Sequence, residues 1–204
     1  MLGKTHRSTG MAVYLSVLTQ ELVHNEPIVK QNVILSTLYT TFVAPITHAL
    51  GLTYVNPNDL YKFLFFALVY GFVLWYALVL PDVDSKNSSL GRHVPFIEDI
   101  IGHRTIFHSL VPIVLLVGLS VITSGLPRNI ATVVTAGYLF HLIEDAWSVS
   151  GINWFVIPIR HKFKVMRYEV EGLFETVVYY LSIALNVVMV AVMLYQIFKL
   201  KMPA

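Results

Sequence analysis

Residues 80–109 read LPDVDSKNSSLGRHVPFIEDIIGHRTIFHS and form a polar segment between two runs that are apolar enough to cross a membrane. Asp82 and Asp84 follow a proline that ends the first run, and His103 and His108 lie where the second run begins. This segment contains the densest group of candidate metal ligands in the chain. It therefore predicts a chain of membrane helices organised around a polar site.

Further candidate ligands lie far from this segment in the sequence. His141 and Asp145 are four residues apart near the end of a later apolar run, so they project from the same helical face. Polar residues are also common at helix ends near headgroups, and this simpler interpretation stays open for the pair. Glu144 is expected to point elsewhere, and His6 lies near the N-terminus. We expect the ligands to converge on one metal site at one membrane face.

The composition indicates an integral membrane protein with a single domain over residues 1–204. Hydrophobic residues make up 56% of the chain and charged residues 13%, against about 25% charged in soluble domains. Without cysteine, a metal must be held by imidazole and carboxylate groups, which suits zinc, with manganese or iron as alternatives. A net charge of +2 and the lack of a basic run interleaved with aromatics give no nucleic-acid signal.

The apolar runs predict an all-α, polytopic helical membrane protein, because strand-type alternation is absent and a non-barrel chain must span a bilayer as helices. Two N-terminal runs, 10–23 and 31–52, predict one or two further membrane-associated helices. Four runs are predicted to be spanning helices, because each has about the 20 residues that are needed to cross the bilayer. They are residues 60–80, 106–126, 129–147 and 173–198.

The predicted spans place the candidate ligands on one side of the membrane. His6 joins them if the chain makes one net crossing between residues 7 and 59. Nine Lys and Arg residues fall on the ligand side and five on the other, which favours a site that faces the cytoplasm. The nine are Lys4, Arg7, Lys86, Arg92, Arg104, Arg160, Lys162, Lys164 and Arg167.

The residues at the start of the apolar run 106–126 could bind an anion. His103 and His108 are five residues apart, about 140° on an ideal helix, so they can share an ion only if the helix begins near Arg104. Gly102 makes such a boundary plausible. Arg104 and His108 would then share a face at a helix N-terminus, where backbone N–H groups and a guanidinium favour phosphate. In the Asp82-Val83-Asp84 pair, one carboxylate is expected to bind the metal and the other to orient a water or a histidine.

These motifs, in this order, resemble the membrane-bound metal-dependent hydrolase family, a bacterial inner-membrane group also described as LexA-binding. The resemblance rests on residues 3–10 (GKTHRSTG), 80–91 (LPDVDSKNSSLG), 102–109 (GHRTIFHS), 137–158 (GYLFHLIEDAWSVSGINWFVIP) and 172–175 (GLFE). It implies an inner-membrane protein with Glu175 as a later acidic site residue and with these family motif positions: His6, Asp82, Asp84, His103, His108, His141 and Asp145. The family pattern has His and Thr where this chain has Ser85 and Phe107.

The first hypothesis is a metal-dependent hydrolase that acts on a phosphoester or related ester, including membrane lipid. A metal-bound water is activated, Asp84 or Glu175 serves as base, and Arg104 stabilises developing negative charge. The second is a non-catalytic, metal-stabilised protein that binds a regulatory protein. The third, a transporter, is disfavoured because its site would lie near the bilayer midplane, whereas these ligands lie at span ends.

Overall fold

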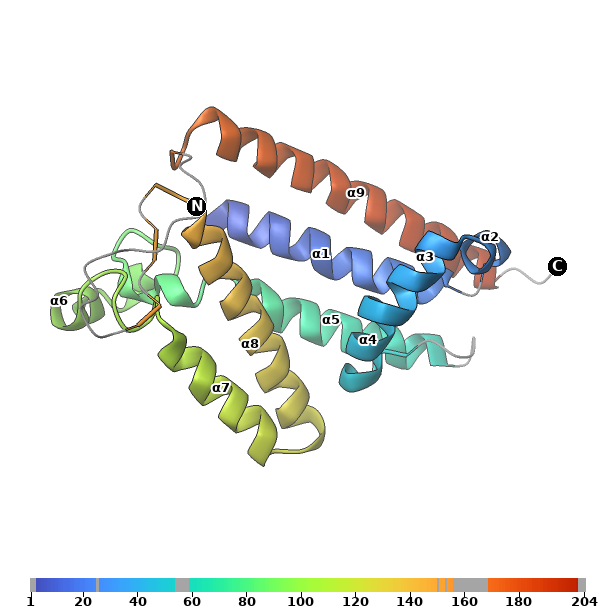
Figure 1. Cartoon of the computed structure of the whole chain (residues 1–204), viewed down its shortest axis with the longest axis horizontal. Helices are drawn as coiled ribbons and strands as arrows, with labels where there is room; N and C mark the ends of the chain where they lie inside the picture. The colour runs from blue at the N-terminus through green and yellow to red at the C-terminus, as the bar shows by residue number, and fades with distance from the viewer. Residues whose placement is uncertain are drawn as a thin grey trace. The chain divides into compact units, whose positions relative to one another are not determined.

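The structure is a computed structural model that describes residues 3–24, 26–53, 59–149, 151–152, 154–155 and 169–201. Nearly all regular structure in these ranges is helical, and these ranges contain no strand. The predicted all-α fold is therefore confirmed (Figure 1). The α-helices are α1 (Gly3–Val23), α2 (Pro27–Gln31), α3 (Val33–Leu38), α4 (Ala44–Leu50), α5 (Leu60–Ala77), α6 (Phe96–Ile101), α7 (Leu110–Ile122), α8 (Gly125–Ala146) and α9 (Leu173–Lys201). A π-helix covers Tyr39–Val43, and 3-10 helices cover Pro81–Asp84 and Gly91–His93.

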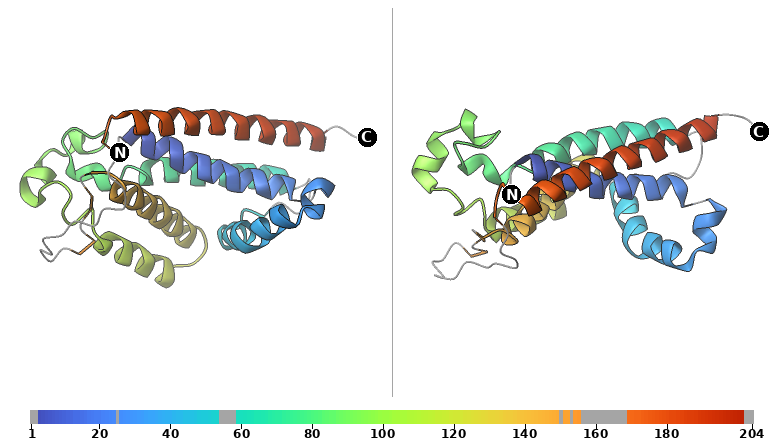
Figure 2. Two further views of the ribbon diagram at one scale, coloured as in Figure 1. Left: turned by 45° about the horizontal axis from the view of Figure 1, so that its top comes forward. Right: turned by 90° about the horizontal axis from the view of Figure 1, so that it is seen from above.

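Three described segments are long and apolar enough to cross a membrane: Val33–Leu50, Leu60–Asp84 and Leu173–Leu200. Two of them match predicted spans, and Figure 2 shows α9 as one unbroken helix. The predicted span 106–126 is wrong in length, because α7 has only 13 residues, or about 20 Å, and the hydrocarbon core is about 30 Å thick. Ser109 sets its start, since the Ser109 hydroxyl accepts a hydrogen bond from the Val111 N–H.

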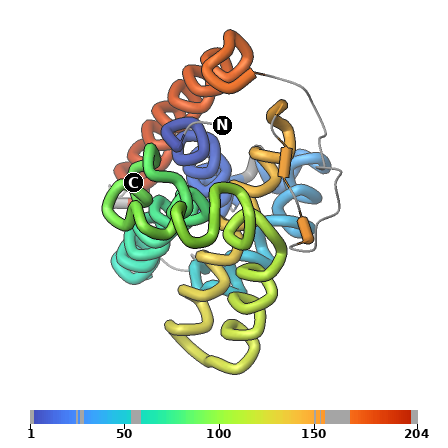
Figure 3. Tube along the Cα trace, turned by 90° about the vertical axis from the view of Figure 1, so that its left-hand side faces the viewer, coloured from blue at the N-terminus to red at the C-terminus, as the bar shows by residue number. Residues whose placement is uncertain are grey.

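The chain divides into two compact units, which are described separately; the prediction of a single domain stays a prediction. The first unit comprises residues 1–10 and 72–181. Its helices α7 and α8 pack against each other as a hairpin (Figure 1). Figure 3 looks onto the loops between α5 and α7, drawn in green. A core around Tyr138, Leu142 and Ile152 supports these loops, and the Tyr138 hydroxyl donates to the Phe107 carbonyl.

Glycines allow three helical segments of the first unit to approach closely. A Cβ at Gly137 of α8 would lie 2.8 Å from the Ala77 Cβ of α5, and one at Gly10 of α1 would overlap a Leu78 methyl. Small residues at such crossings are how membrane helices pack tightly. Gly10 lies one turn after His6, and Gly137 one turn before His141. The close approach therefore brings two distant histidines together.

The second unit comprises residues 11–71 and 182–204. Glu21 is buried in α1, where its carboxylate accepts hydrogen bonds from Tyr39 at 3.1 Å and Thr47 at 2.9 Å. Tyr39 begins the π-helix, so this contact lies at the point where the Val33–Leu50 segment departs from regular α-helix. The Tyr14 hydroxyl donates to the Ala67 carbonyl and ties α1 to α5 within this unit.

Candidate metal centre

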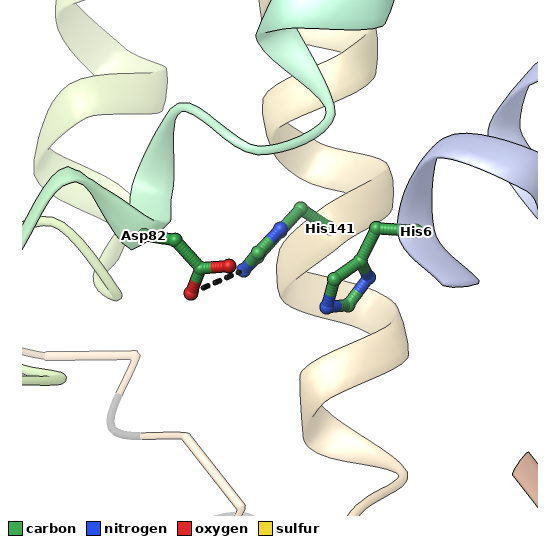
Figure 4. A group of neighbouring side chains, drawn as sticks. All are labelled: His6, Asp82 and His141. Atoms are coloured by element: carbon green, nitrogen blue, oxygen red, sulfur yellow. Dashed lines mark ion pairs between the residues drawn. The ribbon is translucent and has the colours of Figure 1, made fainter. Parts of the chain in front are cut away.

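Histidine and aspartate side chains from four separate segments converge within the first unit. His6 comes from α1, Asp82 from the 3-10 helix after α5, His108 from the loop before α7, and His141 and Asp145 from α8. The three histidines are fully buried, and Asp145 is 1% exposed. Figure 4 shows His6 and His141 side by side, with Asp82 facing His141. The structure thus brings together residues that span almost 140 positions of sequence.

The spacing of the ligand atoms fits a metal ion. Asp82 Oδ1 lies 3.6 Å from Nε2 of both His108 and His141. Asp145 Oδ1 lies 3.4 Å from His6 Nε2, and its Oδ2 lies 3.5 Å from His108 Nε2 and 3.8 Å from His141 Nε2. Ligands placed 2.0–2.1 Å from a tetrahedral zinc ion are about 3.4 Å apart. These separations are slightly too long for hydrogen bonds and suitable for atoms that share a cation.

The Nδ1 atom of each buried imidazole, on the side away from the ligand group, contacts an oxygen acceptor. With the proton of each neutral imidazole on Nδ1, each Nε2 would present a lone pair to the interior, where none of the three Nε2 atoms makes a hydrogen bond. Metal-binding histidines show this arrangement, in which an outer acceptor fixes the tautomer and the ring orientation. The contacts are His6 to Glu144 Oε2 at 2.6 Å, His108 to Asp84 Oδ2 at 3.1 Å, and His141 to the Leu78 carbonyl at 2.8 Å.

Electrostatics also favours a cation at this position. Burial by itself lowers the pKa of His108, but the nearby carboxylates of Asp82, Asp84 and Asp145 outweigh burial and raise that pKa. The His6 and His141 rings stack with centroids 3.9 Å apart, so protonating both would place two positive charges in contact. A divalent ion neutralises the carboxylates while leaving the imidazoles neutral. The residues present therefore fit a metal ion.

The Leu78 carbonyl is available because α5 ends there. The last carbonyls of a helix lack intrahelical donors, and Pro81, three residues on, has no N–H to offer. The same proline starts the 3-10 helix that presents Asp82. The loop that follows is closed by Ser88, whose hydroxyl donates to the Asp82 carbonyl at 2.6 Å and accepts from the Gly91 N–H at 2.7 Å. The position of Asp82 is thus fixed from both sides.

Asp84 and His103 lie at the edge of the ligand group. Asp84 accepts from His103 Nδ1 at 2.9 Å, His108 Nδ1 at 3.1 Å and the Arg104 N–H at 3.0 Å. An aspartate that orients histidines would make such contacts, and this role of Asp84 stays a prediction. His103 is 38% exposed at its side chain, and it joins Asp84 and His108 as a further group with metal-ligand spacing. Its assignment as a metal ligand and that of Asp84 as a base stay predictions.

Arg104 reaches the site by a different route from the one predicted. Residues 102–109 are turns rather than the start of a helix, because Gly102 and Arg104 have φ values of 80° and 59°, which a right-handed helix does not accommodate. The expectation that Arg104 and His108 share a helix face is therefore wrong. The guanidinium nevertheless lies 3.0 Å from Asp145 Oδ2, at the site.

The two glutamates differ from expectation. Glu144, which was expected to point away from the site, is buried and contacts His6 and Thr9. Its position three residues after His141 places it near the same helix face, and this spacing is the signal that could have found it. Glu175 accepts hydrogen bonds from the Thr5 hydroxyl and from the Glu171 N–H, two residues before α9, and it lines a pocket with Thr5. Its catalytic assignment stays a prediction.

The comparisons with known proteins agree with a membrane location. A family model described as YdjM inner membrane protein matches residues 1–202. "Uncharacterized protein YvsG" of Bacillus subtilis (strain 168) is 30% identical over 102 residues, which cover 48% of this chain and 62% of that protein. No solved structure matches the chain. The predicted resemblance to a bacterial inner-membrane family is confirmed at that level, and the chain belongs to the YdjM inner membrane protein family.

Proposed function

We propose that this chain is an integral membrane hydrolase that uses one or two divalent metal ions, with zinc as the first expectation. One observation carries the proposal: three buried Nε2 atoms without hydrogen bonds face two carboxylates, and the Nδ1 of each imidazole contacts an oxygen acceptor. The proposed ligands are His6, Asp82, His108, His141 and Asp145. A metal ion at such a site lowers the pKa of a bound water and makes it a nucleophile at neutral pH.

The residues at the site edge suit ester hydrolysis. Asp82 is 16% exposed at its side chain and Arg104 15%, whereas the three buried histidines are closed to solvent. A substrate would therefore enter between Asp82, His103 and Arg104. The Arg104 guanidinium would stabilise negative charge that develops on the substrate, and its planar fork suits phosphate. We propose a phosphoester or related ester, including membrane lipid, as substrate.

Asp84 is the better supported of the two candidate bases. It contacts His103 and His108, so it can receive a proton through His103 at the exposed edge. Glu175, in the first turn of α9, instead accepts hydrogen bonds from the Thr5 hydroxyl of α1 and from the Glu171 N–H. We assign Asp84 to orient these imidazoles and to accept the proton, and we keep Glu175 as the alternative base.

The orientation of the site forms part of the proposal. The excess of Lys and Arg on the ligand side supports a site that faces the cytoplasm. The final helix then runs away from the site, so the C-terminus lies on the opposite face. A reporter fused after Ala204 tests this directly, and a cytoplasmic signal would reverse the assignment.

The burial of the ligands supports a second candidate function. In it, the metal only stabilises the fold, and the protein binds a regulatory protein without catalysis. Structural metal sites are closed, whereas catalytic sites keep one position open. Two measurements on purified protein in detergent separate the candidates: metal content, and hydrolysis of a panel of phosphoesters and phospholipids. For a hydrolase, His108→Ala loses metal and activity together, while His93→Ala, an exposed histidine of the same loop, keeps both. Stoichiometric metal with no turnover would favour the binding protein.

A further inference from the structure

The short helix α6 exposes a hydrophobic face. Phe96 and Ile100, one turn apart, are 58% and 77% exposed. On the opposite side of the helix, Glu98 accepts a hydrogen bond from the Lys86 N–H at 2.6 Å. Asp99, which is exposed beside Ile100, forms an ion pair with the Lys86 ammonium. The Glu98 contact holds its side of the helix against the loop, and Phe96 and Ile100 stay exposed.

The chain places α6 at a membrane face. The candidate span Leu60–Asp84 ends 12 residues before Phe96, and the apolar helix α7 begins nine residues after Ile101. The helix also packs on the 3-10 helix Pro81–Asp84 that ends this span. We expect a segment tied to the end of a candidate span to lie at the bilayer surface. Hydrophobic side chains exposed there meet the boundary between headgroups and acyl chains.

Exposed charges of both signs lie around α6. Arg92 is exposed in the loop between the span and α6, and Lys86 in the same loop pairs with Asp99. Basic residues beside a membrane attract the phosphates of lipid headgroups. Aromatic side chains such as Phe96 are suited to the same layer, and α6 lies two residues from His103, at the open edge of the metal site.

We propose that α6 is an interfacial lipid-binding helix that inserts Phe96 and Ile100 into the bilayer surface and holds the open edge of the site against phospholipid headgroups. The insertion is independent of catalysis. The consequence for substrate choice rests on the proposed function: the site takes phospholipid from the bilayer rather than a soluble ester.

The lack of cysteine in the chain allows a direct test of insertion. Ile100→Cys carries a single nitroxide label in vesicles of phosphatidylethanolamine and phosphatidylglycerol, with Asn87→Cys, exposed in the same loop, as the water-facing control. Leu68→Cys, on an exposed position of α5, is the lipid-facing control. We expect the label at position 100 to favour collisions with oxygen over a water-soluble nickel chelate, as at position 68. Equal nickel access at positions 100 and 87 would overturn the proposal, as would protection from both reagents, which would indicate a protein partner or a second copy.

A second arm tests the consequence for the substrate. Phe96→Ser with Ile100→Ser should lower hydrolysis of phospholipid in vesicles by at least about tenfold, since two apolar anchors are lost, and leave hydrolysis of a short-chain soluble phosphoester unchanged. An equal loss on both substrates would refute the substrate assignment. If wild-type protein hydrolyses neither substrate, the proposed function fails, whereas the labelling result still decides whether α6 inserts.

Discussion

Replacing Gly137 by alanine tests whether the close packing of α8 on α5 assembles the metal centre. The added methyl would lie 2.8 Å from the Ala77 Cβ and 2.9 Å from a Leu74 methyl. Carbon atoms in contact are about 3.5–4.0 Å apart, so the two helices must separate locally by up to about 1 Å. His141 lies one turn along α8, and its Nδ1 contacts the Leu78 carbonyl, the residue after Ala77.

The required separation exceeds what a metal site tolerates. Metal–ligand distances vary by only about 0.2 Å in well-formed sites, so a shift several times larger removes His141 from the ligand group. Overpacking of this kind typically lowers the free energy of unfolding by about 1–3 kcal/mol. We therefore expect Gly137→Ala to reduce metal content measured by elemental analysis, and to lower the unfolding temperature in detergent.

A matched control lies in the neighbouring helix. A methyl group added at Gly118 of α7 would have no neighbouring atom within 4 Å, so Gly118→Ala introduces no clash and gains up to about 1 kcal/mol of helix propensity. Metal content should stay at the wild-type level in this variant. If Gly137→Ala retains full metal content and stability, then close packing of these helices does not position the site.

The remaining predictions concern individual contacts. Glu144→Gln removes the carboxylate that holds the His6 ring, and it should weaken metal affinity by about 10–100-fold in a competition assay with a chelating dye. Arg104→Lys keeps the charge but loses the planar fork, so kcat should fall while metal content stays unchanged. Tyr39→Phe removes a hydroxyl donor to the buried carboxylate of Glu21, and it should lower the free energy of unfolding by about 1.5–3 kcal/mol, measured by thermal unfolding in detergent.

The sequence predicted the helical architecture because hydropathy and length report directly on membrane helices. It was less successful where local backbone geometry decides the outcome. The run 106–126 is apolar almost throughout, yet its helix begins only at Leu110, after the cap at Ser109 and the left-handed residues Gly102 and Arg104. Hydropathy contains no signal for such turns, so the predicted helix start near Arg104 was wrong.

In the candidate site, residue spacing predicted some contacts, whereas contacts that depend on where a helix ends could not be predicted. The i and i+4 spacing of His141 and Asp145 predicted their shared face, and both lie in the ligand group. Glu144 was expected to point elsewhere, although it lies three residues after His141 and therefore near the same helix face. The Leu78 carbonyl had no sequence signal, since a backbone oxygen becomes available only where a helix happens to end.

The distribution of the ligands along the chain links metal binding to folding of the first unit. His6 precedes all other ligands by more than 70 residues, and it reaches them only when α1 packs through Gly10 against Leu78. No pair of neighbouring residues forms the site alone, so the unfolded chain has no preformed group that binds the ion with the same affinity. A metal ion bound there would therefore stabilise the packing of α1, α5 and α8. It would also offset the repulsion between Asp82 and Asp145, two carboxylates buried within reach of the same histidines.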